Sequence, residues 1–379
     1  MTVKVSKPKF NIREKLSELD KPSGIKGNEL MRSDTAQKAR NLIGAGRKNK
    51  VINGDMRISQ RGTSFSSIGG NAGDTYTLDR FKLQTNNLDE AVATITQDSS
   101  APDGFSKSLK IQCDTVESSV GDSEHARLMY DGEAFDFTDI GFGTPSAKKV
   151  TLSFWVKSNL TGTWGMNFWR GDANRSNLRT YTIDQANTWE HKVMTLSTDA
   201  TGGVVNSDNG FGFRINWGLA TGANFATSHP LDTWHGFQQQ YFYPYDARNT
   251  NFYSSTSNNF YLTGVQLEVS DVATEFEHRH YTEELELCQR YYEAVYMTDG
   301  TAMFKSYESY GGSTNFEMQF KVEKRATPTW SLEGNAAWAG ATPNAFESKS
   351  GCIFQHNAGT QFSLGDAHND LCGSFSCEL

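Results

Sequence analysis

The sequence lacks paired cysteines and long apolar segments. Its 5 cysteines include no C-x-x-C pair, which excludes a zinc ribbon and a thioredoxin-type redox motif. We therefore expect free, mostly buried thiols, although Cys372 and Cys377 are close enough in sequence to pair. No run approaches the roughly 18 apolar residues that a membrane-spanning helix needs. The first residues also lack the apolar centre of a signal peptide. These absences predict a soluble protein made inside a cell.

Positive charge is also scarce. Lys and Arg total 36 against 44 Asp and Glu, which gives a net charge of −8 at pH 7. Binding to nucleic acid or to an anionic membrane surface requires clustered positive charge, so we expect neither partner. Hydrophobic residues make up only 37% of the 379 residues, whereas Gly accounts for 34 of them. This composition is typical of many short strands joined by turns, and the length favours two or three domains.

Residues 1–48 differ from the rest of the chain because their apolar residues recur with helical spacing. Ile12, Leu16 and Leu19 fall on one face of a predicted helix, and Leu42 belongs to a second one. Each helix is too short to be stable alone in water. We therefore expect this segment to dock on a symmetry mate or on another protein, as an anchor.

From about residue 49 the apolar pattern changes to a period of two, which predicts β-strands. Two clear strands place these side chains on one face: Val150, Leu152, Phe154 and Val156 in the first, and Phe211, Phe213, Ile215 and Trp217 in the second. In NFYLTGVQLEV the apolar parity flips, which predicts a β-bulge at Gly264. TYTLDRFKLQ shows a similar flip across Asp79 and Arg80. The pattern indicates an antiparallel β-sandwich over residues 49–280.

The stretch HYTEELELCQRYYEAV predicts one short helix between two β-rich regions. Thr282 is the expected N-cap, and glutamates in the first turn suit the positive end of a helix. Leu285, Cys288 and Tyr292 are spaced to share one face. Strand patterns return after the helix, so residues 281–379 are expected to form a linking helix and a small C-terminal β domain.

Several segments occur together and in a fixed order. They are VINGDMRISQRGTSF, YTLDRF, VTLSFWVKSNLTGTW, NTWEHKVMTL, GVQLEVSDVATEFEHRHYTEELELCQRYYEAV and FKVEKRATPTW. This set resembles a family of bacteriophage virion proteins described as tail fibre or minor tail proteins, many of them from marine and cyanobacterial phages. The resemblance covers roughly residues 50–330, and the block from GVQLE to CQRYY is its most specific part.

The resemblance implies a central module like a carbohydrate-binding jelly roll and an N-terminal virion-attachment segment. It also implies an appendage subunit on the virion, commonly a homotrimer, that contacts the host surface. Our preferred interpretation is a non-enzymatic subunit whose partners are other phage tail or capsid proteins and a host cell-surface polysaccharide. A rigid sandwich with long loops is a common scaffold for such binding. Two alternatives stay open: a purely structural fibre without a ligand, and a glycan-degrading tailspike.

Tryptophan and tyrosine side chains are the candidate glycan-binding residues, because their ring faces stack on sugars. The candidates are Trp164, Trp169, Trp217, Trp234, Tyr241, Tyr243 and Tyr245. The richest local cluster is WHGFQQQYFYPYDARN, in which amides and an acid adjoin the rings. The alternative is that these rings fill the sandwich core or a subunit interface.

The sequence offers little for catalysis or metal binding. Its densest acidic cluster is Asp131, Glu133, Asp136 and Asp139. Glycosidases need paired carboxylates, but a solvated loop face or a structural calcium site is the preferred interpretation. The chain has no EF-hand pattern and no G-x-S-x-G elbow, and no third ligand can be named for His278 and His280. We expect no cofactor, no metal and no enzymatic activity.

Overall fold

The computed structural model divides into two compact units, residues 1–48 and residues 49–379. It describes residues 48–236, 243–244, 250–296, 305–308, 314–332, 341–343, 348–356 and 371–379. The predicted anchor residues Ile12, Leu16, Leu19 and Leu42 lie outside the described residues, so the anchor stays a prediction.

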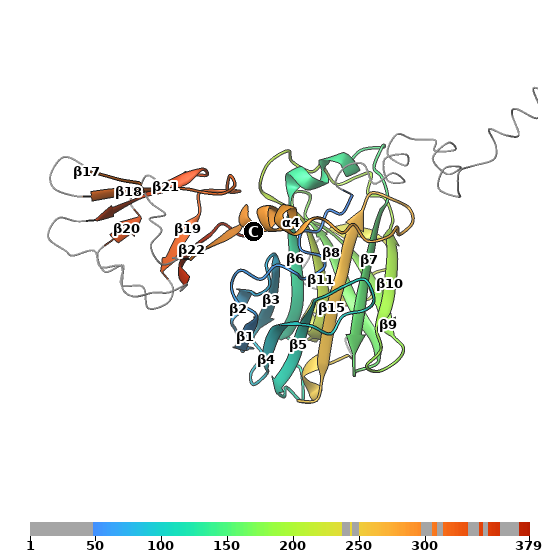
Figure 1. Ribbon diagram of the computed structural model, residues 1–379. Coiled ribbons are helices and arrows are strands. Elements are labelled where there is room, and N and C mark those ends of the chain that lie inside the picture. The colour runs from blue at the N-terminus through green and yellow to red at the C-terminus, as the bar shows by residue number, and fades with distance from the viewer. Residues whose placement is uncertain are drawn as a thin grey trace, which may run out of the picture. The chain divides into compact units, whose positions relative to one another are not determined.

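Two antiparallel sheets form a β-sandwich in the second unit (Figure 1). The six-stranded sheet has the order β1 (Ser64–Gly69), β4 (Val92–Asp98), β5 (Ser108–Thr115), β15 (Asn259–Glu268), β7 (Val150–Ser158) and β10 (Glu190–Leu196). The seven-stranded sheet has the order β13 (Trp234–Gly236), β9 (Arg175–Ile183), β8 (Gly162–Arg170), β11 (Phe211–Thr221), β6 (His125–Glu133), β3 (Phe81–Asn86) and β2 (Gly73–Tyr76). The chain crosses between the sheets repeatedly from β5 to β11, as in a jelly roll, which confirms the predicted fold class.

Short elements complete the sandwich. They are the parallel pair β12 (Ala226–Thr227) and β14 (Tyr243–Pro244), and the 3-10 turns η1 (Ala134–Ile140), η2 (Ala223–Phe225) and η5 (Phe252–Ser254). The core lies between the two sheets and is filled by the inward side chains of both. The alternation predicted for β7 is confirmed, because Val150, Leu152, Phe154 and Val156 are all buried there.

A β-bulge interrupts β15 at the predicted glycine. The pairing of β15 with β7 shifts register between Thr263 and Gln266, and Gly264 has a φ of 62°. A Cβ at Gly264 would also lie 2.8 Å from the ring of Phe105, so glycine suits both the backbone angle and the space. The parity flip at Asp79 and Arg80 has a different cause from the one expected: it is the turn of the β2–β3 hairpin, and not a bulge within a strand.

The predicted late helix is α4 (Tyr281–Gln289), and β-structure follows it. The later strands form two small sheets, one of β16 (Tyr292–Tyr296), β22 (Leu371–Ser376) and β19 (Thr329–Leu332), the other of β17 (Lys305–Glu308), β18 (Thr314–Gln319), β21 (Gly351–His356) and β20 (Ala341–Pro343). The N-cap is His280 and not Thr282, because the His280 ring nitrogen accepts a hydrogen bond from the Thr282 main chain. Tyr292 lies beyond the helix, at the start of β16.

Arg279 joins the segment that enters the sandwich to the segment that leaves it, which lie far apart in the sequence. Its guanidinium is buried and forms ion pairs with Glu277 and Glu284. It also donates to the main-chain oxygens of Asn49 and Val51, which lie just before the sandwich. Glu284, on the first turn of α4, accepts a hydrogen bond from the main chain of the same entering segment. This cluster, which we call the Arg279 clasp, fixes α4 against the entry of the chain.

The described C-terminal residues return to the sandwich. Glu378 forms ion pairs with Arg61 and Arg80. The main-chain oxygen of Leu379 accepts hydrogen bonds from the hydroxyl of Tyr76 and from Nζ of Lys82, the latter at 2.8 Å. The last two residues therefore contact the β2–β3 hairpin at the edge of the seven-stranded sheet.

The cysteines that the structure describes agree with the expectation of free thiols. Cys113, Cys288, Cys352 and Cys377 are all free and buried. Within the same part of the chain, no helix has the length and apolar character that crossing a membrane requires.

The Arg279 clasp generates a prediction about stability. Replacing Arg279 by Ala leaves the buried carboxylate of Glu284 without its cation, so we expect the free energy of unfolding to fall by about 3–5 kcal/mol. Urea denaturation followed by circular dichroism measures this change. Glu283 is exposed on the same helix, and Glu283→Gln should change stability by less than about 0.5 kcal/mol. Equal effects of the two substitutions would contradict the role of the clasp.

Candidate functional site

The outer face of the seven-stranded sheet carries polar side chains on four adjacent strands. Its strands bury one set of alternate residues, such as Leu128 and Tyr130 in β6, and turn the other set away from the core. The cross-strand pairs on the outer side are Lys82 with Met129, Gln84 with Arg127, Asp131 with Arg214, Arg214 with Trp169, and Asn216 with Asn167. We call these residues, together with Asp74 and Phe211, the outer polar face. Its exposed or partly exposed members are Asp74, Gln84, Trp169, Phe211 and Arg214, and the others are buried.

Asp131 is the electrostatic centre of the outer polar face. Its carboxylate accepts two hydrogen bonds from the guanidinium of Arg214, one of them at 2.8 Å, and lies 2.7 Å from Nζ of Lys82. Lys82 also pairs with Asp74 at 2.8 Å. Burial alone would raise the pKa of Asp131, but the charges of Arg214 and Lys82 outweigh it and hold the pKa below its ordinary value. The carboxylate therefore stays ionised.

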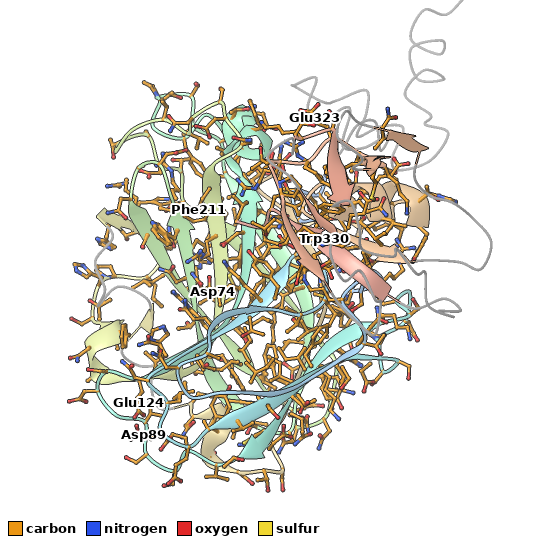
Figure 2. All side chains as sticks on the ribbon, turned by 90° about the vertical axis from the view of Figure 1, so that its left-hand side faces the viewer. Asp74, Asp89, Glu124, Phe211, Glu323 and Trp330 are labelled. Atoms are coloured by element: carbon orange, nitrogen blue, oxygen red, sulfur yellow. The ribbon has the colours of Figure 1, made fainter. Side chains whose placement is uncertain are left out.

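Two aromatic rings stand beside this ion pair. Trp169 on β8 and Phe211 on β11 meet edge to face, with their ring centres 4.9 Å apart. The guanidinium of Arg214 lies 5.0 Å from the centre of the Trp169 ring and 4.9 Å from that of Phe211. Both rings are partly exposed. In Figure 2, Phe211 is labelled above Asp74. The arrangement offers apolar ring surface next to a fixed cation.

Phe211 reaches this position because of a register shift in β11. The pairing of β11 with β6 shifts between Phe211 and Phe213, at Gly212. A Cβ at Gly212 would lie 2.5 Å from the Cα of Ala134, so only glycine fits at that point. The sequence pattern predicted that Phe211 shares a face with Phe213, Ile215 and Trp217. That prediction is wrong for Phe211, because the shift turns its side chain to the outer face beside Trp169.

Amide and imidazole groups extend the outer polar face away from the rings. The side chain of Gln84 accepts from Arg127 at 2.8 Å and lies 3.0 Å from the His125 ring nitrogen. Asn216 donates to the Asn167 side chain at 3.0 Å, and its own side-chain oxygen accepts no hydrogen bond from any described residue. Burial, reinforced by the charge of Arg127, lowers the pKa of His125 to about 3. His125 is therefore neutral at physiological pH.

The tryptophans proposed from sequence lie in three different environments. Trp164 and Trp217 have no exposed surface and belong to the core between the sheets. A ring without exposed surface cannot stack on a sugar, so these two residues are removed from the candidate set. Trp234 is 7% exposed and its indole N–H donates to the main chain of Ser197 at 2.8 Å. Trp169 is the remaining tryptophan candidate with ring surface on an outer face.

The predicted tyrosine cluster is largely beyond what the structure describes. Tyr241 and Tyr245 lie outside the described residues. Tyr243 is placed in β14, but its side chain is not among those described. The sugar-stacking role of these three residues stays a prediction.

The acidic cluster does not form paired carboxylates across a groove. Asp131 and Glu133 lie in β6 and are buried, so they are not part of a solvated loop face as expected. Asp131 pairs with Arg214, Glu133 with Arg290, and Asp139 with Lys50, so each of these acids has its own cation.

The two histidines considered as metal ligands have other contacts. The ring of His278 lies 4.9 Å from that of Phe276, and His280 caps α4. Across the described ranges, no group of three or more His, Cys, Asp and Glu side chains is placed to hold a metal ion.

The outer polar face contains residues that the sequence did not identify as binding candidates, namely Lys82, Gln84, Arg127, Phe211, Arg214 and Asn216. A usable signal was present for the residues of β11, because Arg214 and Asn216 alternate with the core residues Phe213, Ile215 and Trp217. No comparable signal brings β3 next to β6, because that pairing joins residues between 39 (Asn86 with His125) and 49 (Phe81 with Tyr130) positions apart.

Comparison with known proteins gives only distant structural likenesses. The sequence matches no protein-family model and no curated protein. Among solved structures, the enzymatically active domain of bacteriophage CBA120 tailspike protein 4 is 12% identical over 59% of this chain, with a TM-score of 0.29, and the match spans 21% of that chain. A family 11 carbohydrate-binding module from Clostridium thermocellum is 10% identical over 55% of this chain and 95% of its own length, with a TM-score of 0.28.

A sugar-binding protein from Bacteroides thetaiotaomicron is similar to the same extent. It is 10% identical over 59% of this chain and 100% of its own length, with a TM-score of 0.29. At TM-scores below 0.5 these likenesses carry no argument about this chain. The fold assignment rests on the strand order and the core described above.

The low pKa of His125 generates a pH prediction. Between about pH 6.5 and pH 3 the unfolded chain binds a proton that the folded chain does not, so stability is full above this range and falls as the pH drops through it. When the pH falls from 7.5 to 5.0, we expect protonation of His125 in the unfolded chain to lower the free energy of unfolding by about 2 kcal/mol. Urea unfolding at the two pH values measures this change. In the His125→Gln variant, the free energy of unfolding should differ between pH 7.5 and pH 5.0 by about 2 kcal/mol less than in the unchanged protein. An equal difference in both proteins would refute the lowered pKa of His125.

Proposed function

We propose that this chain is a non-enzymatic subunit of a phage virion appendage and that its β-sandwich binds a polysaccharide of the host cell surface. The resemblance of residues 50–330 to phage tail fibre and minor tail proteins supports the virion location. The jelly-roll fold is compatible with that role. In the proposal, residues 1–48 attach the subunit to other phage tail or capsid proteins, and the subunit functions as a homotrimer.

The observation that carries the binding part of the proposal is the ring pair of the outer polar face. Trp169 and Phe211 are partly exposed, are mounted on two adjacent strands and are 4.9 Å apart. Sugars present both apolar C–H surface and hydroxyl groups, so a site for them combines rings with fixed hydrogen-bonding groups. Arg214 supplies such a group beside the rings and is held by the buried Asp131, and Gln84 supplies an amide further along the face.

The strands beneath the ring pair make it rigid before any ligand arrives. Arg214 is held by two hydrogen bonds to Asp131, and Asp131 is buried and also paired with Lys82. A preorganised site loses less conformational entropy on binding. Each single contact with a sugar is weak, so the proposal relies on several subunits engaging one polysaccharide at the same time.

The state of the acidic residues supports a binding role over hydrolysis. A glycosidase needs one carboxyl group whose pKa is raised so that it can donate a proton, and a second one across the scissile bond. On the outer polar face, the pKa values of Asp131 and Asp74 are both lowered, because the neighbouring cations outweigh burial. Neither group is suited to act as a general acid at neutral pH.

The ring pair gives the first test of this proposal. Trp169→Ala and Phe211→Ala should each weaken binding of purified host cell-surface polysaccharide by at least about tenfold. Phe135→Ala is the matched control, because Phe135 is an exposed ring on η1, and it should leave affinity unchanged. The polymer length should stay constant during incubation. A shortened polymer would favour the glycan-degrading alternative, and the absence of any glycan binding would favour a purely structural fibre.

The anchor role of residues 1–48 gives a second test. A chain that begins at residue 49 keeps the whole second unit, so we expect a folded β-rich protein that unfolds cooperatively. We also expect it to be missing from assembled particles, measured by mass spectrometry of virions from a phage that carries the deletion. Aggregation of the shortened chain, or its normal incorporation, would show that the segment has another role.

A further inference from the structure

The outer face of the six-stranded sheet, on the other side of the sandwich core, carries two lysines that alternate with two rings. Lys110 on β5 pairs in register with Tyr261 on β15, and Tyr261 pairs with Lys157 on β7. Trp189 comes just before β10, whose first residue pairs with Val156, so it lies next to Lys157. We call Lys110, Tyr261, Lys157 and Trp189 the lysine–aromatic row.

The lysine–aromatic row points away from the core. The neighbours of its members along the strands, among them Ile111, Val156 and Phe260, are buried between the sheets. Because successive residues of a strand point to opposite faces, the row lies on the outer side. All four of its side chains are partly exposed. The row is therefore open to a ligand and is built on three hydrogen-bonded strands and the start of a fourth.

The distances within the row are short enough for one ligand to contact all members. Nζ of Lys157 lies 4.0 Å from the centre of the Tyr261 ring and 5.0 Å from that of Trp189. Nζ of Lys110 lies 5.6 Å from the Tyr261 ring centre. The two rings meet edge to face at 6.0 Å. Neighbouring strands are about 4.8 Å apart, so the row extends over about 14 Å, which matches two or three sugar units.

The two lysines of the row have no acid in direct contact. In the described part of the chain neither forms an ion pair, whereas nearby Lys192 pairs with Glu190 at 2.6 Å. Burial lowers the pKa of Lys157, and among the neighbouring charges Asp98, which raises it, has a larger influence than Lys110, which lowers it. Nζ of Lys157 donates to the hydroxyl of Ser100 at 2.6 Å, which fixes its position. An anion placed beside the row would give both ammonium groups a direct partner.

We infer that the lysine–aromatic row is a second saccharide site and that it takes a sugar carrying a carboxylate or a sulfate group. The rings of Trp189 and Tyr261 provide apolar surface for the sugar, and Lys110 and Lys157 bind its anionic group. Salt bridges to a ligand on such a partly exposed surface are individually weak. The rings and the two cations together give the site its selectivity for acidic over neutral sugars.

The same residue types also occur where single-stranded nucleic acid binds, and here the charges favour the saccharide. A nucleic-acid groove follows the backbone with many cations over several nucleotides. The row offers two lysines, and the whole chain carries a net charge of −8. Nucleic acid would therefore be repelled beyond the row itself.

The ring surface continues beside the row. Trp155 on β7 pairs with His191 on β10, and their rings are 5.0 Å apart. These residues lie two positions along the strands from Lys157 and Trp189, on the same face. A sugar chain that leaves the row in this direction would meet further aromatic surface, so an oligosaccharide is expected to bind more tightly than a single sugar.

The test is calorimetric titration of the full chain with trigalacturonate, a sulfated galactan oligosaccharide, neutral galactotriose and a short single-stranded oligonucleotide. We expect at least one of the two acidic ligands to bind, with an affinity that falls as salt is added, and galactotriose to bind at least about tenfold more weakly. Failure of both acidic ligands, equal binding of galactotriose, or binding of the oligonucleotide alone would overturn the inference.

Variants locate the site and separate it from the outer polar face. The double variant Lys110→Gln, Lys157→Gln and the variant Trp189→Ala should each weaken acidic-ligand binding by at least about tenfold. Lys192→Gln is the matched control, because Lys192 is a nearby lysine that already has an acid partner, and it should bind normally. Trp169→Ala changes the outer polar face and should leave acidic-ligand binding at the lysine–aromatic row unchanged. A failure of the function proposed for Trp169 can therefore be told apart from a failure of the row. Normal binding by the double variant would refute the site.

Discussion

The buried guanidinium of Arg279 is the contact on which the order of the rest of the second unit depends. A buried arginine is tolerated only when its charge is balanced and its donors are used. Here Glu277 and Glu284 balance the charge, and the two terminal nitrogens of the guanidinium also donate to main-chain oxygens of the entering segment. The start of the sandwich, its exit after β15 and the helix α4 are therefore fixed together. The short helix closes the sandwich, which explains its place in a β-rich chain. The sequence segments VINGDMRIS and TEFEHRHYTEEL meet at this point.

Local patterns predicted the fold well and the candidate site poorly, for a physical reason. Alternation identifies which residues share a face, so the inward set of β7 and the bulge at Gly264 were predictable. The same alternation groups Trp217 with Phe213 and Ile215, and these are core residues. Trp217 therefore packs in the core and is not a sugar ligand. Ring type alone does not distinguish a core residue from a surface residue, since large rings are useful in both places. The outer polar face also depends on strand pairings between distant segments, which local patterns do not reveal.

The cations on the two outer faces of the sandwich have different partners. On the seven-stranded sheet, Lys82 and Arg214 converge on the buried carboxylate of Asp131, so the cations are largely neutralised before a ligand arrives. Such a face suits an uncharged ligand that exchanges hydrogen bonds with fixed partners. On the six-stranded sheet, Lys157 stands between two rings with a hydroxyl as its hydrogen-bond partner. The two outer faces of the sandwich thus differ in how their cations are balanced.

Lys82 belongs at once to the outer polar face and to the attachment of the last two described residues. Its Nζ contacts Asp131 and Asp74 on the sheet and the main-chain oxygen of Leu379. Two events that involve one group are thermodynamically linked, and the linkage is reciprocal. The side chain of Lys82 is only 2% exposed, so its ammonium group is shared among these partners and not with solvent. A change that weakens the contacts of Lys82 with Asp131 and Asp74 therefore also alters how firmly the C-terminal residues are held against the sheet.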